Sequence, residues 1–183
     1  GLHPALTMAA GAERIQRYRH PVAQSTRLGA HAMLVFCARG YGLYANLTRF
    51  VAFETMDEAL LERHRAVAEI EAAGLDRSKP KASLADLYFT LERAYSARGY
   101  PGEIDNHHQG GTTGYLSREA IATPTQLDRL AVGNAIAINP SLAGAKIEDT
   151  FVITEQGLEN MTLSDWPTFE CGTRPRPHIL ERQ

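Results

Sequence analysis

Two amphipathic helix patterns in succession, within residues 55–99, limit the folds open to this chain more than any other feature. The first begins at a capping box, Thr55-Met56-Asp57-Glu58, and Gly74 predicts its C-terminal stop. The second begins at a similar pattern, Ser83-Leu84-Ala85-Asp86, and Gly99 predicts its end. Each segment has an apolar stripe at helical spacing, which is typical of a helix that packs one face on a core.

Strand-like segments lie on both sides of these helices. Residues 31–37 and 41–53 are separated by Ala38-Arg39-Gly40, and this pattern predicts a hairpin. Residues 1–29 show little periodicity. The tail from Pro167 is rich in Pro and Arg, and we expect it to lie on the surface. The order of elements predicts an α+β domain, with an antiparallel sheet covered by helices on one face. Further short strands are predicted after the helices, at residues 112–118, 132–138 and 150–154.

Length and composition predict one globular domain over residues 1–183. Of the 183 residues, 44% are hydrophobic, which is enough to build a core. The formal net charge of −2 and the lack of a basic run argue against nucleic acid as a partner. No stretch is long and apolar enough for a membrane span, so no membrane partner is expected. The two cysteines, Cys37 and Cys171, form no disulfide framework, so we expect a reducing, cytoplasmic environment.

The segment Asn106-His107-His108-Gln109-Gly110-Gly111-Thr112-Thr113-Gly114-Tyr115 carries the clearest chemical pattern in the chain. Its two adjacent histidines can ligate metal or transfer protons near neutral pH. The glycines that follow would let the backbone approach whatever the histidines hold. An acidic block, Ile147-Glu148-Asp149-Thr150, lies about forty residues later. Together the two segments predict an active site.

Several segments of the chain, taken in order, resemble the M24 "pita-bread" family of methionine aminopeptidase, Xaa-Pro aminopeptidase, prolidase and creatinase. The resemblance covers about residues 18–165, with residues 167–183 as a C-terminal tail. It implies the pita-bread fold, whole or in a partial form, a hydrolase of aminopeptidase or creatinase type, and a homodimer. The segments that carry it are Leu47-Thr48-Arg49-Phe50, Gly99-Tyr100, His107-His108-Gln109-Gly110-Gly111 and Lys146-Ile147-Glu148-Asp149-Thr150-Phe151-Val152-Ile153-Thr154.

Metal-dependent members of this family use two Asp, one His and two Glu as ligands, and this sequence departs from that set. The second Asp position is Asn46, and the position eleven residues earlier is Val35. The His matches His108, with His107 as the less favoured register. The first Glu position is Asn139, so only Glu148 keeps its carboxylate. Because charge compensation for two cations is lost, we expect no metal cofactor. A single divalent Mn, Co or Zn ion on His108 and Glu148 is the alternative.

Creatinase resembles this fold and works without metal, which suggests acid–base chemistry. By this resemblance His20 and His108 would transfer protons, while Glu148 and Glu119 would orient the substrate or stabilise charge. The substrate would be a small C–N-bonded molecule or a short peptide. Gly114 stands where creatinase has a histidine, which argues against creatinase activity itself. The expected substrate-binding residues are His107, Asn46, Asn139 and Arg118.

Two other functions remain open from the sequence. The chain could be a pseudo-peptidase that binds a peptide or small molecule without turnover. It could instead be a metallo-aminopeptidase with non-standard ligands, such as Glu103, Asp105 or Asp149.

The same residues also have purely structural interpretations. His107 and His108 could be polar side chains at a strand edge. Glu148 could form an ion pair with Lys146 or Arg49, although ion pairs on the surface contribute little to stability.

Overall fold

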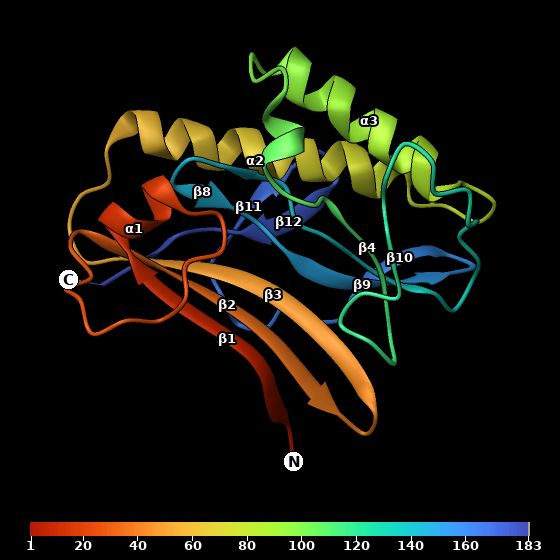
Figure 1. Ribbon diagram of the computed structural model, residues 1–183, viewed down its shortest axis with the longest axis horizontal. Coiled ribbons are helices and arrows are strands. Elements are labelled where there is room, and N and C mark those ends of the chain that lie inside the picture. Colours follow the sequence, from red (N-terminus) through yellow and green to blue (C-terminus); the bar gives the residue numbers. More distant parts are fainter. Residues whose placement is uncertain (183) are drawn as a thin grey trace.

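The computed structural model describes residues 1–182, in which two mainly antiparallel sheets lie edge to edge (Figure 1). The strand order is β1-β2-β3-β13 in the first sheet and β10-β9-β6-β4-β5 in the second. The backbone N–H of Thr48 in β3 donates to the carbonyl of Glu148, next to β9, at 3.0 Å and connects them. The first sheet contains β1 (His3–Gly11), β2 (His31–Gly40), β3 (Leu43–Ala52) and β13 (Leu180–Glu181).

The second sheet is formed by the middle of the chain, and two small ribbons complete the strands. The sheet contains β4 (Gly110–Thr113), β5 (Ala120–Ile121), β6 (Ala135–Ile138), β9 (Asp149–Thr154) and β10 (Gly157–Asn160). The ribbons are β7 (Ser141–Leu142) with β8 (Ala145–Lys146), and β11 (Thr168–Cys171) with β12 (Arg174–Pro177).

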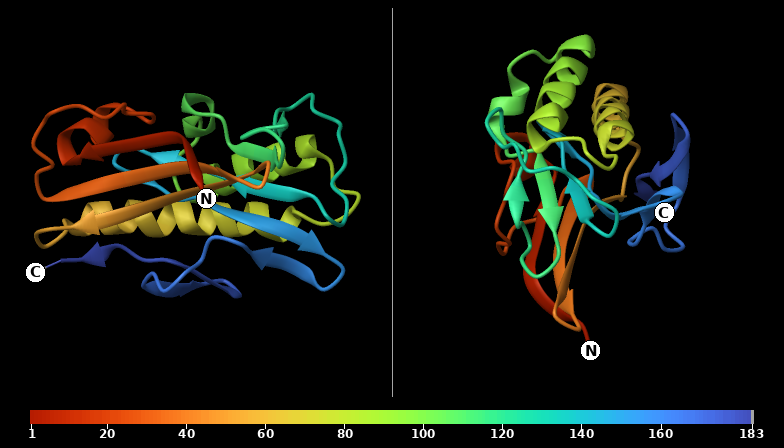
Figure 2. Two further views of the ribbon diagram at one scale, coloured as in Figure 1. Left: turned by 90° about the horizontal axis from the view of Figure 1, so that it is seen from below. Right: turned by 90° about the vertical axis from the view of Figure 1, so that its right-hand side faces the viewer.

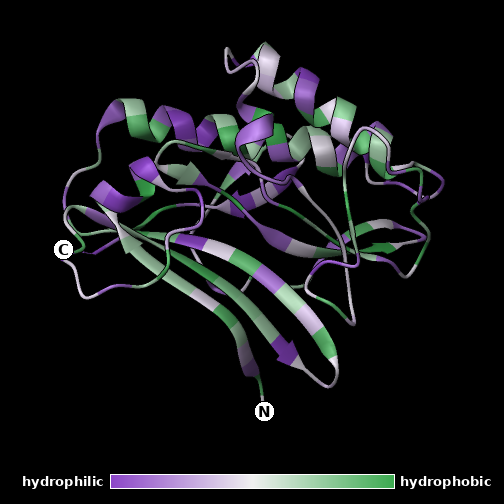
Figure 3. Ribbon diagram, in the orientation of Figure 1, coloured by the Kyte–Doolittle hydropathy of each residue, from purple (hydrophilic) through white to green (hydrophobic). Residues whose placement is uncertain are grey.

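Helices cover one side of this layer. The two long helices lie next to each other above the sheets, and the C-terminal strands run beside α2 (Figure 2). Along both helices hydrophobic residues alternate with hydrophilic ones (Figure 3), as expected for elements with one buried face. No helix within residues 1–182 is long and apolar enough to cross a membrane. The helices are α1 (Ala12–Arg17), α2 (Glu58–Arg77), α3 (Leu84–Ala97) and the 3-10 turn η1 (Glu103–Asn106).

The helix patterns in the sequence predicted one of the two long helices closely. Ser83 is the N-cap of α3 in a complete capping box with Asp86, and Gly99 follows its end with a φ of +84°. The limits of α2 were predicted wrongly. Asp57, not Thr55, caps α2 through a bond from the N–H of Ala59.

The predicted stop of α2 at Gly74 is also wrong, because the helix continues to Arg77. A Cβ at Gly74 would lie 2.8 Å from Cδ2 of Leu91 and 3.0 Å from Cδ1 of Ile138. The glycine therefore allows close packing of α2 on α3 and β6, rather than ending the helix.

The predicted hairpin is confirmed as β2 and β3, with its turn at Tyr41-Gly42 rather than at residues 38–40. Its register places Val35 opposite Thr48 and Cys37 opposite Asn46, so these side chains share one face. Both cysteines of the chain are free, as expected, and both are buried.

Other strand predictions need correction. Residues 1–29, expected to be irregular, contain β1, which pairs with β2, and α1. Where strands were predicted at 112–118 and 132–138, the structure has the shorter strands β4 at residues 110–113 and β6 at residues 135–138. The predicted strand at 150–154 lies within β9. The tail, expected on the surface, adds a parallel strand to β3 and buries Arg176 completely.

Candidate active site

The candidate site is formed where four loops and strands meet on one face of the sheets. His20 follows α1, and His107 and His108 lie between η1 and β4. Lys146 is the last residue of β8, and Glu148 precedes β9 by one position, so both side chains of this extended segment point to the same side. Arg118, from the segment between β4 and β5, completes the group through its contact with Glu148.

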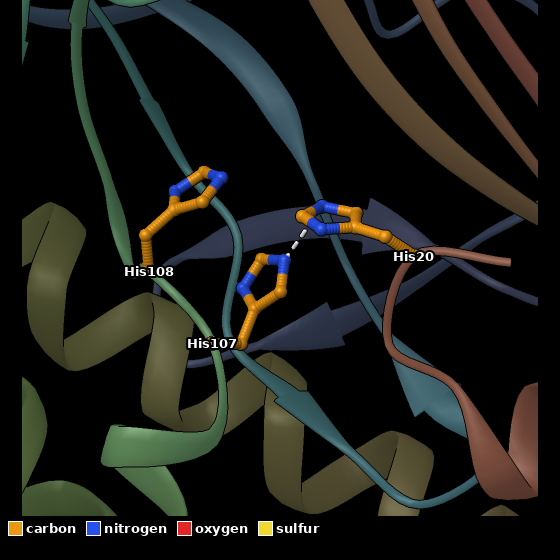
Figure 4. A group of neighbouring side chains, drawn as sticks. All are labelled: His20, His107 and His108. Carbon is orange, nitrogen blue, oxygen red and sulfur yellow. Dashed lines mark hydrogen bonds between the residues drawn. The ribbon is translucent and has the colours of Figure 1, made fainter.

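The three histidines form a compact group (Figure 4). The Nε2 atoms of His107 and His20 are 2.7 Å apart, which is hydrogen-bonding distance. The ring of His108 stacks on that of His107, with ring centres 4.5 Å apart and planes inclined by 24°. The Nδ1 atom of His108 accepts a hydrogen bond from the backbone N–H of Gly110, at 3.2 Å. The structure therefore joins His20 to the His107-His108 pair, which lies 87 residues away in sequence.

Lys146 is a buried cation against this group. Its Nζ lies 3.0 Å from Nε2 of His107 and 3.4 Å from Nε2 of His20, and only 3% of the residue is exposed. Burial lowers the pKa of Lys146 to about 8, and the charge of Glu148 opposes that shift. From the sequence, Lys146 was expected only as a possible partner of Glu148. Its spacing of two residues from Glu148 in an extended segment was the signal that could have placed it in the site.

The three imidazoles are uncharged in this environment. Burial lowers the pKa of His20 and of His108 to about 4, and the positive charges of Lys146 and Arg118 act in the same direction. Burial lowers the pKa of His107 still further. All three imidazoles are therefore neutral near pH 7, and each has one unprotonated ring nitrogen. In His108 that nitrogen is Nδ1, which already accepts the hydrogen bond from Gly110.

Glu148 is held by partners that the sequence did not indicate. It is 1% exposed, forms an ion pair with Arg118, and accepts a hydrogen bond from the Thr48 hydroxyl at 3.4 Å. Arg49, considered as its partner, instead forms an ion pair with Asp149 at 2.7 Å. The Glu148 carboxylate therefore lies between a guanidinium and a hydroxyl.

Asn46 and Asn139 are buried amides, with 0% and 2% exposure. The Nδ2 atom of Asn46 donates to Oγ1 of Thr113 at 3.1 Å, and its backbone N–H donates to Oγ1 of Thr150 at 2.7 Å. The side-chain oxygens of both asparagines accept no hydrogen bond from the residues that the structure describes. The backbone N–H of Asn139 donates to the carbonyl of Gln109 at 3.2 Å, next to His108 in the chain.

The structure does not bring Glu119 into the histidine group. Its side chain is exposed and accepts a hydrogen bond from the backbone N–H of Tyr115 at 2.7 Å. The acidic residues considered as non-standard ligands are also engaged elsewhere. Glu103 pairs with Arg19 at 2.6 Å, Asp105 accepts from Tyr88 at 3.3 Å, and Asp149 pairs with Arg49 and Arg176.

The glycines after the histidines serve strand packing. Gly110 has a φ of +87°, and a Cβ there would lie 2.0 Å from the carbonyl oxygen of Ala137 in β6. A Cβ at Gly111 would lie 2.0 Å from the carbonyl oxygen of Ala120 in β5. These contacts are with neighbouring strands, so the glycines set the position of the histidine loop rather than opening space for a ligand.

A hollow of about 420 Å³ leads to the exposed edge of the group, at His20. Its size suits a small molecule or the end of a short peptide. Its walls come from α1, the loop after it and η1, and consist of Gln16, Arg17, Tyr18, Arg19, His20 and Asn106.

Comparison with solved structures identifies the fold. The prolidase from Pyrococcus horikoshii OT3 superposes with a TM-score of 0.78 at 24% identity, over 88% of this chain and 49% of that one. An Xaa-Pro dipeptidase from Bacillus anthracis gives 0.77 at 20% identity, over 96% of this chain and 48% of that one. These matches define the α+β pita-bread fold predicted from the sequence. The N-terminal domain of FACT complex subunit SPT16 from Cicer arietinum shares this fold too. It superposes with a TM-score of 0.73 at 12% identity, over 88% of this chain and 43% of that one.

The chain belongs to metallopeptidase family M24, whose family model matches residues 6–155. An uncharacterized peptidase from Staphylococcus aureus strain MW2 is 29% identical over 124 residues, which are 64% of this chain and 35% of that protein. The chain thus spans about a third of the curated relative and about half of the solved structures it matches. The predicted family is confirmed, and the match begins twelve residues earlier than the expected residue 18.

Proposed function

We propose that this chain carries the catalytic site of an M24-type hydrolase that cleaves a C–N bond in a small substrate or short peptide without a dinuclear metal centre. Water supplies the nucleophile, and the imidazole of His20, at the exposed edge of the group, removes its proton as the oxygen bonds to the carbon. That proton passes to the nitrogen of the leaving group as the C–N bond breaks, so the imidazole is regenerated. Glu148 and Arg118 orient the substrate.

One observation carries this proposal: the ammonium group of Lys146, 3.0 Å from His107 and 3.4 Å from His20. A buried positive charge stabilises the negative charge that develops on a substrate oxygen when water attacks. Such a group takes the place of the electrophile that a metal ion would supply, and it costs no reorganisation because the protein already holds it. The neutral imidazole of His20 beside it is available to accept a proton.

The residues at the family's ligand positions also fit a dinuclear centre poorly. Asn46 and Asn139 are neutral amides, Val35 offers no donor, and both oxygens of Glu148 are already in contact with Arg118 or Thr48. Two divalent cations there would face the positive charges of Arg118 and Lys146 with one carboxylate to balance them. The cost in electrostatic energy supports a metal-free mechanism.

Turnover after metal removal tests the proposal. Protein treated with a chelator is assayed against peptides with proline in the second position and against other small amides and guanidino compounds. We expect turnover to survive chelation, and Lys146→Met to lower kcat/KM by roughly a hundredfold, because a fixed charge that stabilises the transition state is lost. The control is Lys79→Met, which removes an exposed lysine outside the site.

Two results would contradict the proposal in different ways. If the protein carries two equivalents of Mn, Co, Zn or Fe and loses turnover on chelation, the metallo-aminopeptidase interpretation replaces it. If substrates bind but none is turned over, the chain is a pseudo-peptidase.

Two further properties, the homodimer expected from the resemblance and the cytoplasmic location expected from the cysteines, stay predictions. Light scattering in solution measures whether the protein is a homodimer. A cytoplasmic location is supported by the two free, buried cysteines and is checked by cell fractionation.

A further inference from the structure

The three histidines of the site converge closely enough to share one ion. At least one ring nitrogen of each residue lies within 4.8 Å of those of the other two, and the pair His20–His107 is at 2.7 Å. His107 is 8% exposed, and its Nδ1 has no hydrogen-bond partner among the described residues. His20 lies at the exposed edge of the group, where an ion can enter from solvent.

The donor set selects the chemical class of the ion. Three imidazoles with no carboxylate favour Zn²⁺ and similar borderline transition ions, and disfavour Mg²⁺ and Ca²⁺, which prefer oxygen. Zn–N bonds of about 2.0–2.1 Å in a tetrahedral site separate the ligand nitrogens by roughly 3.3 Å. The His20–His107 nitrogens must therefore move apart by about 0.6 Å, which the exposed His20 loop can accommodate.

We propose that His20, His107 and His108 bind a single Zn²⁺ ion in competition with the Lys146 ammonium group. This site shares only His108 with the ligand positions of the family and uses neither Asn46 nor Asn139. The ammonium now lies against two of the three rings, so the ion must displace it. The inference rests on the proposed function in one respect: a bound ion occupies the imidazole of His20 that would transfer the proton, and therefore inhibits turnover.

Zinc binding to the chelator-treated protein, measured by equilibrium dialysis or calorimetry without substrate, tests this site. We expect about one equivalent of Zn²⁺, with Mg²⁺ failing to compete. His20→Asn and His107→Asn should each weaken binding at least tenfold, because each removes one of three ligands. The control is His178→Asn, which removes a histidine outside the group. Circular dichroism verifies that each variant is folded, and the exposed position of His20 makes that variant the safer of the two.

Lys146→Met provides the sharper measurement. Removal of the competing positive charge should tighten Zn²⁺ binding roughly tenfold or more, whereas Lys79→Met should leave it unchanged. The proposed site would be overturned if the protein bound no Zn²⁺, or if both histidine variants bound it as tightly as wild type. The proposed competition with Lys146 would be overturned if wild type and Lys146→Met bound Zn²⁺ with equal affinity. None of these measurements needs a substrate. The zinc site can therefore be confirmed when the proposed catalytic function is wrong, and it can be wrong when that function is confirmed.

Discussion

At the scale of single residues, buried positive charges distinguish this molecule. Lys146 lies against imidazoles, and Arg176 is fully buried between two carboxylates. Nε of Arg176 donates to Glu71 at 2.6 Å, and one of its terminal nitrogens donates to Asp149 at 2.8 Å. Lysine and arginine are rarely buried without partners, so a sequence-based interpretation places them on the surface by default. Their partners come from distant parts of the chain, and only the fold reveals them.

Arg176 should therefore matter far more than its neighbour Arg174. Arg176→Ala leaves Glu71 and Asp149 buried with less compensation, and we expect a loss of about 3–5 kcal/mol in the free energy of unfolding. Arg174 forms an exposed pair with Asp76, and Arg174→Ala should cost about 0–1 kcal/mol. Urea denaturation of both variants measures the difference. Similar losses would mean that the buried network contributes little.

At the scale of elements, local sequence signals predicted whether a segment is a helix or a strand better than they predicted its first and last residues. The capping box at Ser83 and the hairpin of β2 and β3 depend on neighbouring residues, so the sequence indicated both. The end of α2 was wrong because Gly74 is required by contact with α3 and β6, not by a turn. β1 was missed because its exposed outer residues hide the alternation that marks a strand.

Substitutions at Gly110 and Gly133 can be compared to measure how much strand packing at Gly110 adds to the cost of replacing a glycine. Both have a φ near +90°, at +87° and +88°, but a Cβ meets the Ala137 carbonyl at Gly110 and open space at Gly133. Gly133→Ala should cost about 1–2 kcal/mol of stability from backbone strain alone. Gly110→Ala adds overpacking of about 1–3 kcal/mol and shifts the histidine loop. Thermal unfolding compares the two variants, and an equal loss would exclude the predicted clash.

At the scale of the whole molecule, one ionic network connects four elements. Arg49 from β3, Asp149 from β9, Arg176 from β12 and Glu71 from α2 follow one another at hydrogen-bonding distance. The network joins both sheets, the longest helix and the C-terminal tail. Burial raises the pKa of Glu71 to about 7, although the charge of Arg176 opposes the shift.

This raised pKa predicts how global stability changes with pH. Between the ordinary pKa of a glutamate and about 7, the unfolded chain releases the Glu71 proton while the folded protein keeps it. Its stabilising contribution is complete at low pH and is lost as the pH rises through 7. The whole effect is on the order of 3 kcal/mol. Glu71→Gln removes this titration, so the free energy of unfolding of the variant should rise relative to that of wild type between about pH 5 and about pH 8.

Urea denaturation across that pH range measures the effect. Glu62→Gln, an exposed change on the same helix, is the control and should follow the wild-type curve. If the curve of Glu71→Gln is also parallel to wild type, Glu71 is ionised throughout and Arg176 dominates its environment.

The sequence by itself determined the class of fold, the family and the segments that carry the chemistry, because these depend on local patterning and on short motifs. Through the family resemblance it also marked His20, His107, His108, Arg118 and Glu148 as candidates, but not how these groups contact one another. The tertiary structure decided that His20 contacts His107, that Lys146 lies against both rings, that Glu148 pairs with Arg118, and that Glu119 stays in solvent. The physical reason is that burial and charge pairing depend on distances between residues far apart in the chain, which local patterns do not encode.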